Sequence, residues 1–501
     1  MTPSSSNQPA GNVFQDGATP FAAPLLFAGF CLFILLTPLF DLVPGLGMYN
    51  EKRVLELGLL MLGATLLLTS RALHRGWLNI FVSLPASVKI TLFTLMMLGL
   101  TSAWFSRLPV WAVIDVATYV LITITTLSFA AACRQLPQWV DKILAATLLA
   151  VMTGYSIQFI SGLIAAFTNP AIGLIQSALF SNFAHVRFFS QFQSWLLPLS
   201  ILPVLLLSRP SKWGIKYLAA AATTAWWFML FTSGTRASLL ALPVAAILVI
   251  TFYRRAAWPW LRWMLLTAAT GLIVYLMVFF VLPTLTHTTS TASVITNTVG
   301  RDLTDSSGRW ILWQRAIEMI QQHPLLGVGP MHYACDPTNH IAAHPHNSTL
   351  QIAAEWGLPA LLVMVFILGY GIVSWLQRSR THPLPEPGQT LKIALLASLL
   401  TAAVHAQFCG ILIMPLSQVM LMVVVGRMLS QHLNPAAGLD HIPAYATPAL
   451  FIICAATLLT IVIFVLPQIP TLEHWQSDIQ LHGYALEPRF WQQGRLCDDL
   501  G

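Results

Sequence analysis

The chain has 501 residues, of which 56% are hydrophobic and 9% charged, and its mean hydropathy is +0.72. Soluble globular domains carry about 25% charged residues, so the composition excludes a soluble enzyme, a disordered chain and a nucleic-acid-binding protein. It predicts an all-α polytopic membrane protein, and the net charge of +7 is interpreted through the positions of the lysines and arginines relative to a bilayer.

The chain opens with a tail, residues 1–20, that contains no Lys or Arg and is predicted to be disordered. Because the tail lacks the basic segment of a cleavable signal peptide, the first apolar run is expected to remain as a helix. A spanning helix needs about 20 mostly apolar residues, and such runs predict about 12–13 transmembrane helices. The candidate spans lie near residues 21–41, 54–70, 87–105, 109–132, 143–167, 193–208, 217–233, 237–252, 264–283, 357–376, 393–412, 414–429 and 447–467.

The distribution of positive charge orients these spans. With the N-terminus in the cytoplasm, most of the 25 Lys and Arg residues fall on cytoplasmic connections, as the positive-inside rule requires. The chain then divides into a tail, two groups of spans, two outer loops and an outer C-terminal tail. The predicted boundaries are 1–20 for the tail, 21–282 for the first spans with a smaller outer loop at 169–193, 283–356 for a large outer loop containing short helices, 357–467 for the last spans and 468–501 for the polar tail.

Two arginines interrupt otherwise apolar or aromatic segments on the outer side. Arg236 follows Ser-Gly-Thr between two apolar runs, and Arg187 lies among phenylalanines in the smaller outer loop. A charge at the bilayer centre costs roughly 2.5–3.5 kcal/mol on insertion scales, so Arg236 is expected to face a cavity or a partner. The alternative for both residues is that they reach the outer lipid headgroups.

The large outer loop contains a stretch, Gly308 to Gln321, with apolar residues at helical spacing. It predicts an amphipathic helix on the membrane surface, with Ser306 or Ser307 as the N-cap. Arg309 then falls in the first turn, where a cation opposes the helix dipole unless an anion binds beside it. Pairing of Arg309 with a nearby aspartate, or with lipid headgroups, is the alternative. The apolar positions are Trp310, Trp313, Ile317 and Ile320.

Four histidines and a cysteine fall within residues 332–346 of the same loop. The spacing matches no familiar zinc motif, so no metal is expected. His346 and Asn347 precede Ser348-Thr349-Leu350-Gln351, which fits a capping box that opens another helix. A neutral imidazole held there can act as a general base. His346 is therefore the candidate base, and Asn347 can orient it. A purely structural or interfacial role for these histidines is the alternative.

The six cysteines form no CxxC pair. Cys335 and Cys497 lie in polar segments on the same predicted outer side. The sequence therefore allows a disulfide between them but does not decide whether it forms.

Several motifs together resemble one family. They are Ser-Gly-Thr-Arg at 233–236, Gly-Arg-Trp at 308–310, His-Pro-Leu-Leu-Gly-Val-Gly at 323–329 and His-Pro-His-Asn-x-x-Leu-Gln-x-x-x-Glu-x-Gly at 344–357. This pattern resembles the bacterial O-antigen ligase superfamily, which includes O-antigen ligases, O-antigen polymerases and protein O-oligosaccharyltransferases.

The resemblance implies a multi-pass protein of the bacterial inner membrane with its active site facing the periplasm. It implies an inverting, metal-independent glycosyl transfer from undecaprenyl diphosphate to an acceptor hydroxyl, with no cofactor. His346 would be the catalytic base, Arg236 and Arg309 would hold the diphosphate, Arg187 would add to that site and His344 would assist.

The sequence does not determine the acceptor; within the superfamily, lipid A-core sugar is the acceptor preferred narrowly here over two others. These are Ser or Thr of an exported protein such as a pilin, for a protein O-oligosaccharyltransferase, and a second lipid-linked glycan, for a polymerase. The alternative from another class is a transporter for polyprenyl-linked glycan. Transporters generally bind substrate near the membrane midplane, often between repeated halves, whereas the candidate residues here cluster on the outer side.

Overall fold

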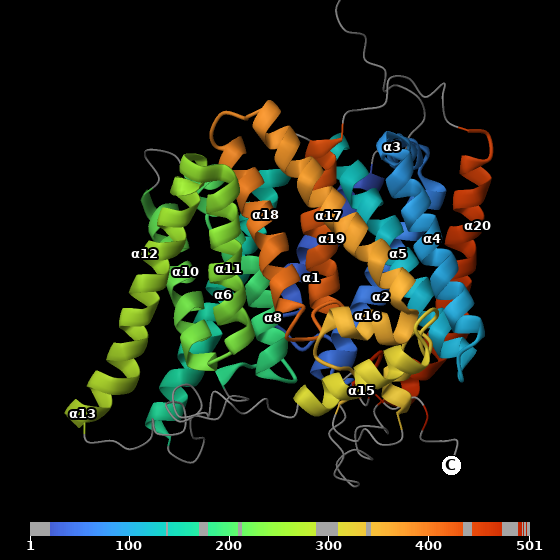
Figure 1. Ribbon diagram of the computed structural model, residues 1–501. Helices are drawn as coiled ribbons and strands as arrows, with labels where there is room; N and C mark the ends of the chain where they lie inside the picture. Colours follow the sequence, from blue (N-terminus) through green and yellow to red (C-terminus); the bar gives the residue numbers. More distant parts are fainter. Residues whose placement is uncertain are drawn as a thin grey trace, which may run out of the picture.

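The computed structural model describes residues 21–136, 139–169, 179–208, 213–286, 309–336, 342–433, 443–472, 489–492, 494 and 497. The predicted N-terminal tail and the predicted N-cap, Ser306 or Ser307, lie outside these residues. Over the described part of the chain the fold is helical with no strand, which confirms the all-α polytopic class (Figure 1).

The helices, in chain order, are of very different lengths. They are α1 (Ala22–Leu36), α2 (Gly47–Thr69), α3 (Arg71–Ser83), α4 (Ala86–Trp104), α5 (Pro109–Gln135), α6 (Val140–Thr168), α8 (Val186–Leu196), η1 (Leu197–Leu199), α9 (Leu202–Leu207), α10 (Trp213–Ser233), α11 (Arg236–Tyr253), η2 (Arg254–Ala257), α12 (Trp258–Leu276), η3 (Met277–Val281), α13 (Leu282–Thr286), α15 (Arg309–Gln322), η4 (His332–Cys335), α16 (Ser348–Trp356), α17 (Leu358–Thr381), α18 (Gly388–His405), α19 (Pro415–His432), α20 (Ala446–Thr460), η6 (Ile461–Val465) and η7 (Leu466–Thr471).

Within the described residues, eight helices are long and apolar enough to cross a membrane, or up to nine if α2 and α3, bent by 99°, count as one span. This number is smaller than the predicted 12–13 spans for identifiable reasons. Helix α1 is short, α10 and α19 are long enough but less apolar, and the 50-residue stretch Arg236–Leu285 counts once. A straight helix of that length would be about 75 Å long, far more than a bilayer. It breaks at η2, and Figure 1 shows α11 and α12 as separate rods.

Helix α5 occupies the centre of the α1–α5 half and packs against α1, α2, α3, α4, α19 and α20. Glycines allow two of these neighbours to approach closely. A Cβ at Gly63 of α2 would lie 2.8 Å from Thr125 Cγ2, and one at Gly426 of α19 would lie 2.9 Å from Phe129 Cδ1. Small residues at such contacts are the usual means of bringing helices together in membranes, where tight packing replaces the hydrophobic driving force.

The predicted span near 54–70 starts earlier than expected, at Gly47, so that charged residues lie inside α2. Lys52 and Arg53 are both buried. Arg53 donates to Gln418 Oε1 at 2.7 Å and pairs with Glu56 at 2.5 Å, and Lys52 donates to the carbonyl of Asn182 at 2.7 Å. Because each cation has partners, the helix can bury charges that the hydropathy pattern placed before the span.

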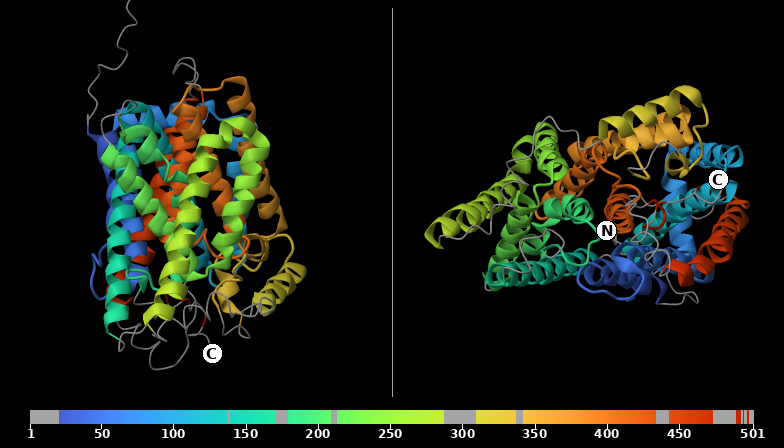
Figure 2. Two further views of the ribbon diagram at one scale, coloured as in Figure 1. Left: turned by 90° about the vertical axis from the view of Figure 1, so that its left-hand side faces the viewer. Right: turned by 90° about the horizontal axis from the view of Figure 1, so that it is seen from below.

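Helices α15 and α16 lie together at one end of the bundle, here named the α15–α16 end (Figures 1 and 2). The starts of α8 and α11 point to the same end, and the described C-terminal residues reach it as well. Successive long helices alternate in direction, so loops distant in sequence meet here. This end contains every residue proposed for chemistry.

The predicted amphipathic helix is confirmed as α15, with a difference in the buried face. Leu312 and Ala316 are buried, whereas Trp310 and Ile317 are exposed. Ala316 packs with Tyr333 in a small apolar cluster. The prediction of a helix is therefore correct, but the face of α15 that packs against η4 and α16 is not the face formed by the predicted apolar positions.

Candidate active site at the α15–α16 end

Each of the three arginines singled out from the sequence lies in the first turn of a helix. Arg187 is the second residue of α8, Arg236 the first of α11 and Arg309 the first of α15, and all three are half-buried. A helix N-terminus carries partial positive charge, so a cation placed there is unfavourable unless an anion offsets it. All three helix starts lie at the same end of the bundle.

The helix break predicted at Arg236 is confirmed. Helix α10 ends at Ser233, Gly234 has a positive φ of 58°, and α11 begins at Arg236. Two residues further on, the hydroxyl of Ser238 donates to the carbonyl of Ser190 in α8 at 3.1 Å. The break thus places the start of α11 against the first turns of α8.

His346 lies two residues before the start of α16, within reach of the charges of Arg187 and Arg309. Its side chain is buried, and burial, followed by the charges of Arg187, Arg309 and His185, lowers its pKa to about 3. An imidazole normally titrates near 6.5, so burial and the arginine charges keep His346 neutral at physiological pH. The structure therefore brings Arg187 and Arg309 into electrostatic contact with His346.

His344 and His346, here named the histidine pair, are arranged by contacts on both sides. The His346 backbone has a positive φ of 52°, its N–H donates to His344 Nδ1 at 3.2 Å, and the two rings are 4.3 Å apart. On one side, Trp313 Nε1 of α15 donates to the carbonyl of Pro345 at 3.0 Å. From the α18–α19 connection, a Cβ at Gly410 would lie 2.7 Å from His344 Cε1. The pair is thus held between α15 and the α18–α19 connection.

Burial dominates the electrostatics of His344 as well. Its side chain is completely buried, and burial, followed by the charge of His346, lowers its pKa well below the usual value. His344 is neutral, which fits its role as the acceptor for the His346 N–H.

Asn347 has a different contact from the one expected. Helix α16 begins at Ser348, and Asn347 is its N-cap: the side-chain oxygen accepts from the Leu350 N–H at 3.0 Å. The capping box predicted from Ser348 is wrong by one residue. Ser348 instead donates its N–H to the carbonyl of Ala406 at 2.8 Å. Asn347 therefore fixes the helix start that directly follows His346.

The His-Pro-Leu-Leu-Gly-Val-Gly turn packs its backbone against the C-terminal end of α16. The Val328 N–H donates to the carbonyl of Ala354 at 2.8 Å. At Gly327, where φ is 69°, a Cβ would lie 2.4 Å from the carbonyl carbon of Glu355. Only glycine permits this approach, which explains the motif as a packing requirement.

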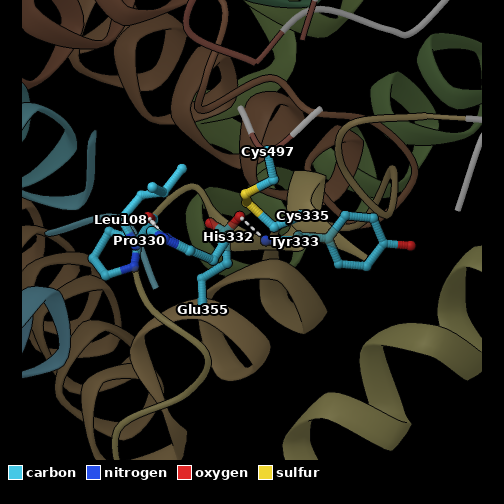
Figure 3. The surroundings of a disulfide bond; sticks show 7 residues. All are labelled: Leu108, Pro330, His332, Tyr333, Cys335, Glu355 and Cys497. Carbon is cyan, nitrogen blue, oxygen red and sulfur yellow. Dashed lines mark hydrogen bonds between the residues drawn. A yellow bond between two sulfur atoms is a disulfide. The ribbon is translucent and has the colours of Figure 1, made fainter. Parts of the chain in front are cut away.

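Two of the residues considered as metal ligands are engaged elsewhere. His332 accepts the Leu108 N–H on Nε2 at 2.8 Å, and its Nδ1 lies 2.7 Å from the carbonyl of Pro330. Cys335 forms a disulfide with Cys497, which confirms the pairing that the sequence left open (Figure 3). Among the described residues, no group of three or more His, Cys, Asp or Glu is arranged to hold a metal ion. His340 lies outside them.

Sequence reasoning missed a buried polar network next to the site. His405, at the end of α18, has Nδ1 2.8 Å from Ser194 Oγ of α8, and Ser194 donates to Ser238 Oγ of α11 at 3.0 Å. The only signal was a histidine inside a predicted apolar span, and its partners come from two other helices. Arg489 and Asp115 were missed for the same reason and are described below.

The described chain is thus a multi-pass membrane protein with three arginines on helix starts at one end, two of which, Arg187 and Arg309, act on the neutral His346. The model of the O-antigen ligase family matches residues 218–365, from α10 into α17, and includes Arg236, Arg309 and the histidine pair but not Arg187. The match confirms the resemblance to the O-antigen ligase superfamily. It supports a glycosyltransferase of the O-antigen ligase or polymerase type, with a lipid-linked glycan and an acceptor as partners in general. A comparison with curated proteins gives no match.

Proposed function

We propose that this protein transfers a glycan en bloc from undecaprenyl diphosphate to an acceptor hydroxyl, with lipid A-core sugar as the acceptor. The proposed location is the periplasmic face of the bacterial inner membrane, and the proposed transfer inverts the anomeric centre without a metal or cofactor. The observation that carries the proposal is the neutral, buried His346 next to Arg187 and Arg309 at a gathering of helix N-termini.

In this mechanism the arginines bind the diphosphate. Arg236 and Arg309 donate charge-assisted hydrogen bonds to its oxygens, and Arg187 adds a third positive charge. The bound anion cancels part of the repulsion that lowers the pKa of His346. Donor binding therefore makes His346 a stronger base at the moment when one is needed.

His346 then accepts the proton of the acceptor hydroxyl as the hydroxyl oxygen attacks the anomeric carbon. The bond between that carbon and the diphosphate oxygen breaks on the opposite face, which inverts the configuration. The departing undecaprenyl diphosphate carries the negative charge, which the arginines stabilise. No residue of the chain becomes covalently attached to the glycan.

The first test uses purified protein and an undecaprenyl diphosphate-linked glycan, with lipid A-core and a pilin offered separately. His346→Ala should abolish product, whereas His323→Ala, an exposed histidine of the same loop, should not. Transfer to the pilin alone would make the protein an O-oligosaccharyltransferase, and longer lipid-linked chains would make it a polymerase. Full activity of His346→Ala would refute the base. No product from wild type with any acceptor would contradict the transferase and favour a transporter.

The second test measures donor binding directly. Arg236→Ala and Arg309→Ala should each weaken donor affinity roughly ten- to hundredfold, since a hydrogen bond to a charged group contributes about 1.5–3 kcal/mol. Arg315→Ala is the matched control, because Arg315 lies on α15 but pairs with Glu318 at the surface. Normal donor affinity in both test variants would refute the proposed diphosphate site.

A further inference from the structure

Two motif residues of α16 have no part in the proposed reaction. Gln351 and Glu355 are buried and lie one turn apart, and both contact Arg489 from the C-terminal end of the chain. Arg489 Nη2 is 2.5 Å from Glu355 Oε2, and Arg489 Nη1 donates to the Gln351 amide oxygen at 2.7 Å when that oxygen faces it. Gln351 and Glu355 therefore hold an arginine that lies far away in the sequence.

The residues around Arg489 are fastened to α2. The C-terminal segment is defined here as residues 489–492 together with Cys497. Tyr49 donates its hydroxyl to the carbonyl of Arg489 at 3.1 Å, and Arg53 Nε donates to the carbonyl of Phe490 at 3.3 Å. The Gln492 N–H donates to Asn50 Oδ1 at 2.7 Å. The segment therefore joins α16 to the interior of the bundle.

A disulfide fastens the same segment to the loop that precedes α16. Cys497 is bonded to Cys335 at the end of η4, and the neighbouring Tyr333 N–H donates to Glu355 Oε1 at 3.2 Å (Figure 3). Glu355 thus accepts a hydrogen bond from Arg489 on one carboxylate oxygen and from the η4 backbone on the other. Figure 3 shows the disulfide, Tyr333 and Glu355 in one cluster.

Arg489 also places its positive charge beside two buried carboxyl groups. The same Nη2 atom is 3.5 Å from Asp115 Oδ2 of α5, and Arg489, Glu355 and Asp115 are all buried. Burial raises the pKa of Glu355 to about 7, and the Arg489 charge acts in the opposite direction. Without Arg489, two carboxyl groups would remain buried beside each other without the cation that joins them.

We propose that Arg489 is a positioning residue, which fixes α16 and the His346 at its start relative to α2 and α5. Helix α16 has only nine residues, so it needs anchors at both ends. Its first residue is bonded to the carbonyl of Ala406, and at its last turn Arg489 adds a charged side-chain anchor to the backbone bonds made by Val328 and Gly329. This inference rests on the proposed function only in assigning His346 its role.

The kinetic test compares variants of the two partners. Arg489→Met should lower kcat at least tenfold and leave the KM for the donor within about twofold, because the diphosphate site stays intact. Arg489→Lys should recover part of the loss. Glu355→Gln should be milder than Arg489→Met, because Arg489 keeps Asp115. Wild-type kcat in Arg489→Met would overturn the proposal, and a change confined to KM would assign Arg489 to substrate binding instead.

A second readout does not depend on transfer activity. Hydrogen–deuterium exchange of peptides covering residues 342–356 should accelerate in Arg489→Met and in a Cys335→Ser/Cys497→Ser variant, while exchange in α5 stays slow. Arg315→Met is the control. Unchanged exchange in both test variants would refute the anchoring role. If wild type transfers no glycan, the proposed function fails, and the exchange result still decides whether the C-terminal segment holds α16.

Discussion

The electrostatics of His346 predict an unusual pH dependence. Burial and the Arg187 and Arg309 charges all disfavour the imidazolium form, so the pKa of His346 is lowered to about 3 in the unliganded protein. The base therefore stays neutral as the pH falls through the range in which histidine is normally protonated. The perturbation is a change of assay pH from 7.5 to 5.5.

The expected magnitude follows from the two pKa values. A histidine with the ordinary pKa of about 6.5 is about 90% neutral at pH 7.5 and about 10% neutral at pH 5.5, so the rate would fall about tenfold. With a pKa near 3, His346 is almost entirely neutral at both values. The contribution of the base to kcat/KM should therefore be flat.

The assay is the pH profile of kcat/KM, which reports the free enzyme. Glu355, whose pKa lies near 7, titrates in the same range, so the profile is also measured in Glu355→Gln. The donor diphosphate is esterified at both ends and keeps its charge. A tenfold fall centred near pH 6.5 in Glu355→Gln would refute the reasoning about His346.

Four further predictions concern stability and local geometry. Asn347→Ala should lower the free energy of unfolding by about 1 kcal/mol, whereas Asn347→Asp should keep the N-cap, and thermal unfolding of both checks this. Gly410→Val should displace His344 and lower kcat with donor affinity unchanged; wild-type kcat would show that the position of His344 is not critical. Gly357→Ala, at φ 87° and with its Cβ 2.2 Å from the carbonyl oxygen of Leu325, should destabilise the protein by about 1 kcal/mol or more, and an unchanged melting temperature would contradict this. The folded histidine pair stays neutral while the same histidines in the unfolded chain bind protons, so the free energy of unfolding should decrease as the pH falls below about 6.5. The decrease over the first pH unit should be up to about 1.4 kcal/mol per histidine, and a constant melting temperature would contradict that.

The sequence pattern was sufficient to predict those features of the fold that depend on a few consecutive residues. Apolar run length predicted the polytopic class, and helical spacing predicted α15 almost to its ends. The Ser-Gly-Thr stretch predicted the break before Arg236. Each of these features depends on a few consecutive residues, because backbone preference and burial period act over one or two helical turns.

The sequence also predicted that the three arginines lie on one side of the membrane, because successive spans alternate in direction. Positive-inside counting puts Arg187, Arg236 and Arg309 on one predicted side. In the structure they lie on helix starts at the same end of the bundle. Hydropathy could not determine the number of spans, because α10 and α19 bury polar residues against their neighbours and are less apolar than the other long helices.

The tertiary structure alone decided the contacts that join distant parts of the chain. Arg489 meets Glu355 across 134 positions, and the choice of Cys497 as the partner of Cys335 depends on the same approach. A buried charge is tolerated only where another element supplies its partner, and that partner has no fixed spacing in sequence. The sequence thus determined the helices and the chemical groups available at one end of the bundle. Packing between helices distant in sequence determined which groups are buried, why both histidines of the pair stay neutral and which groups contact α16.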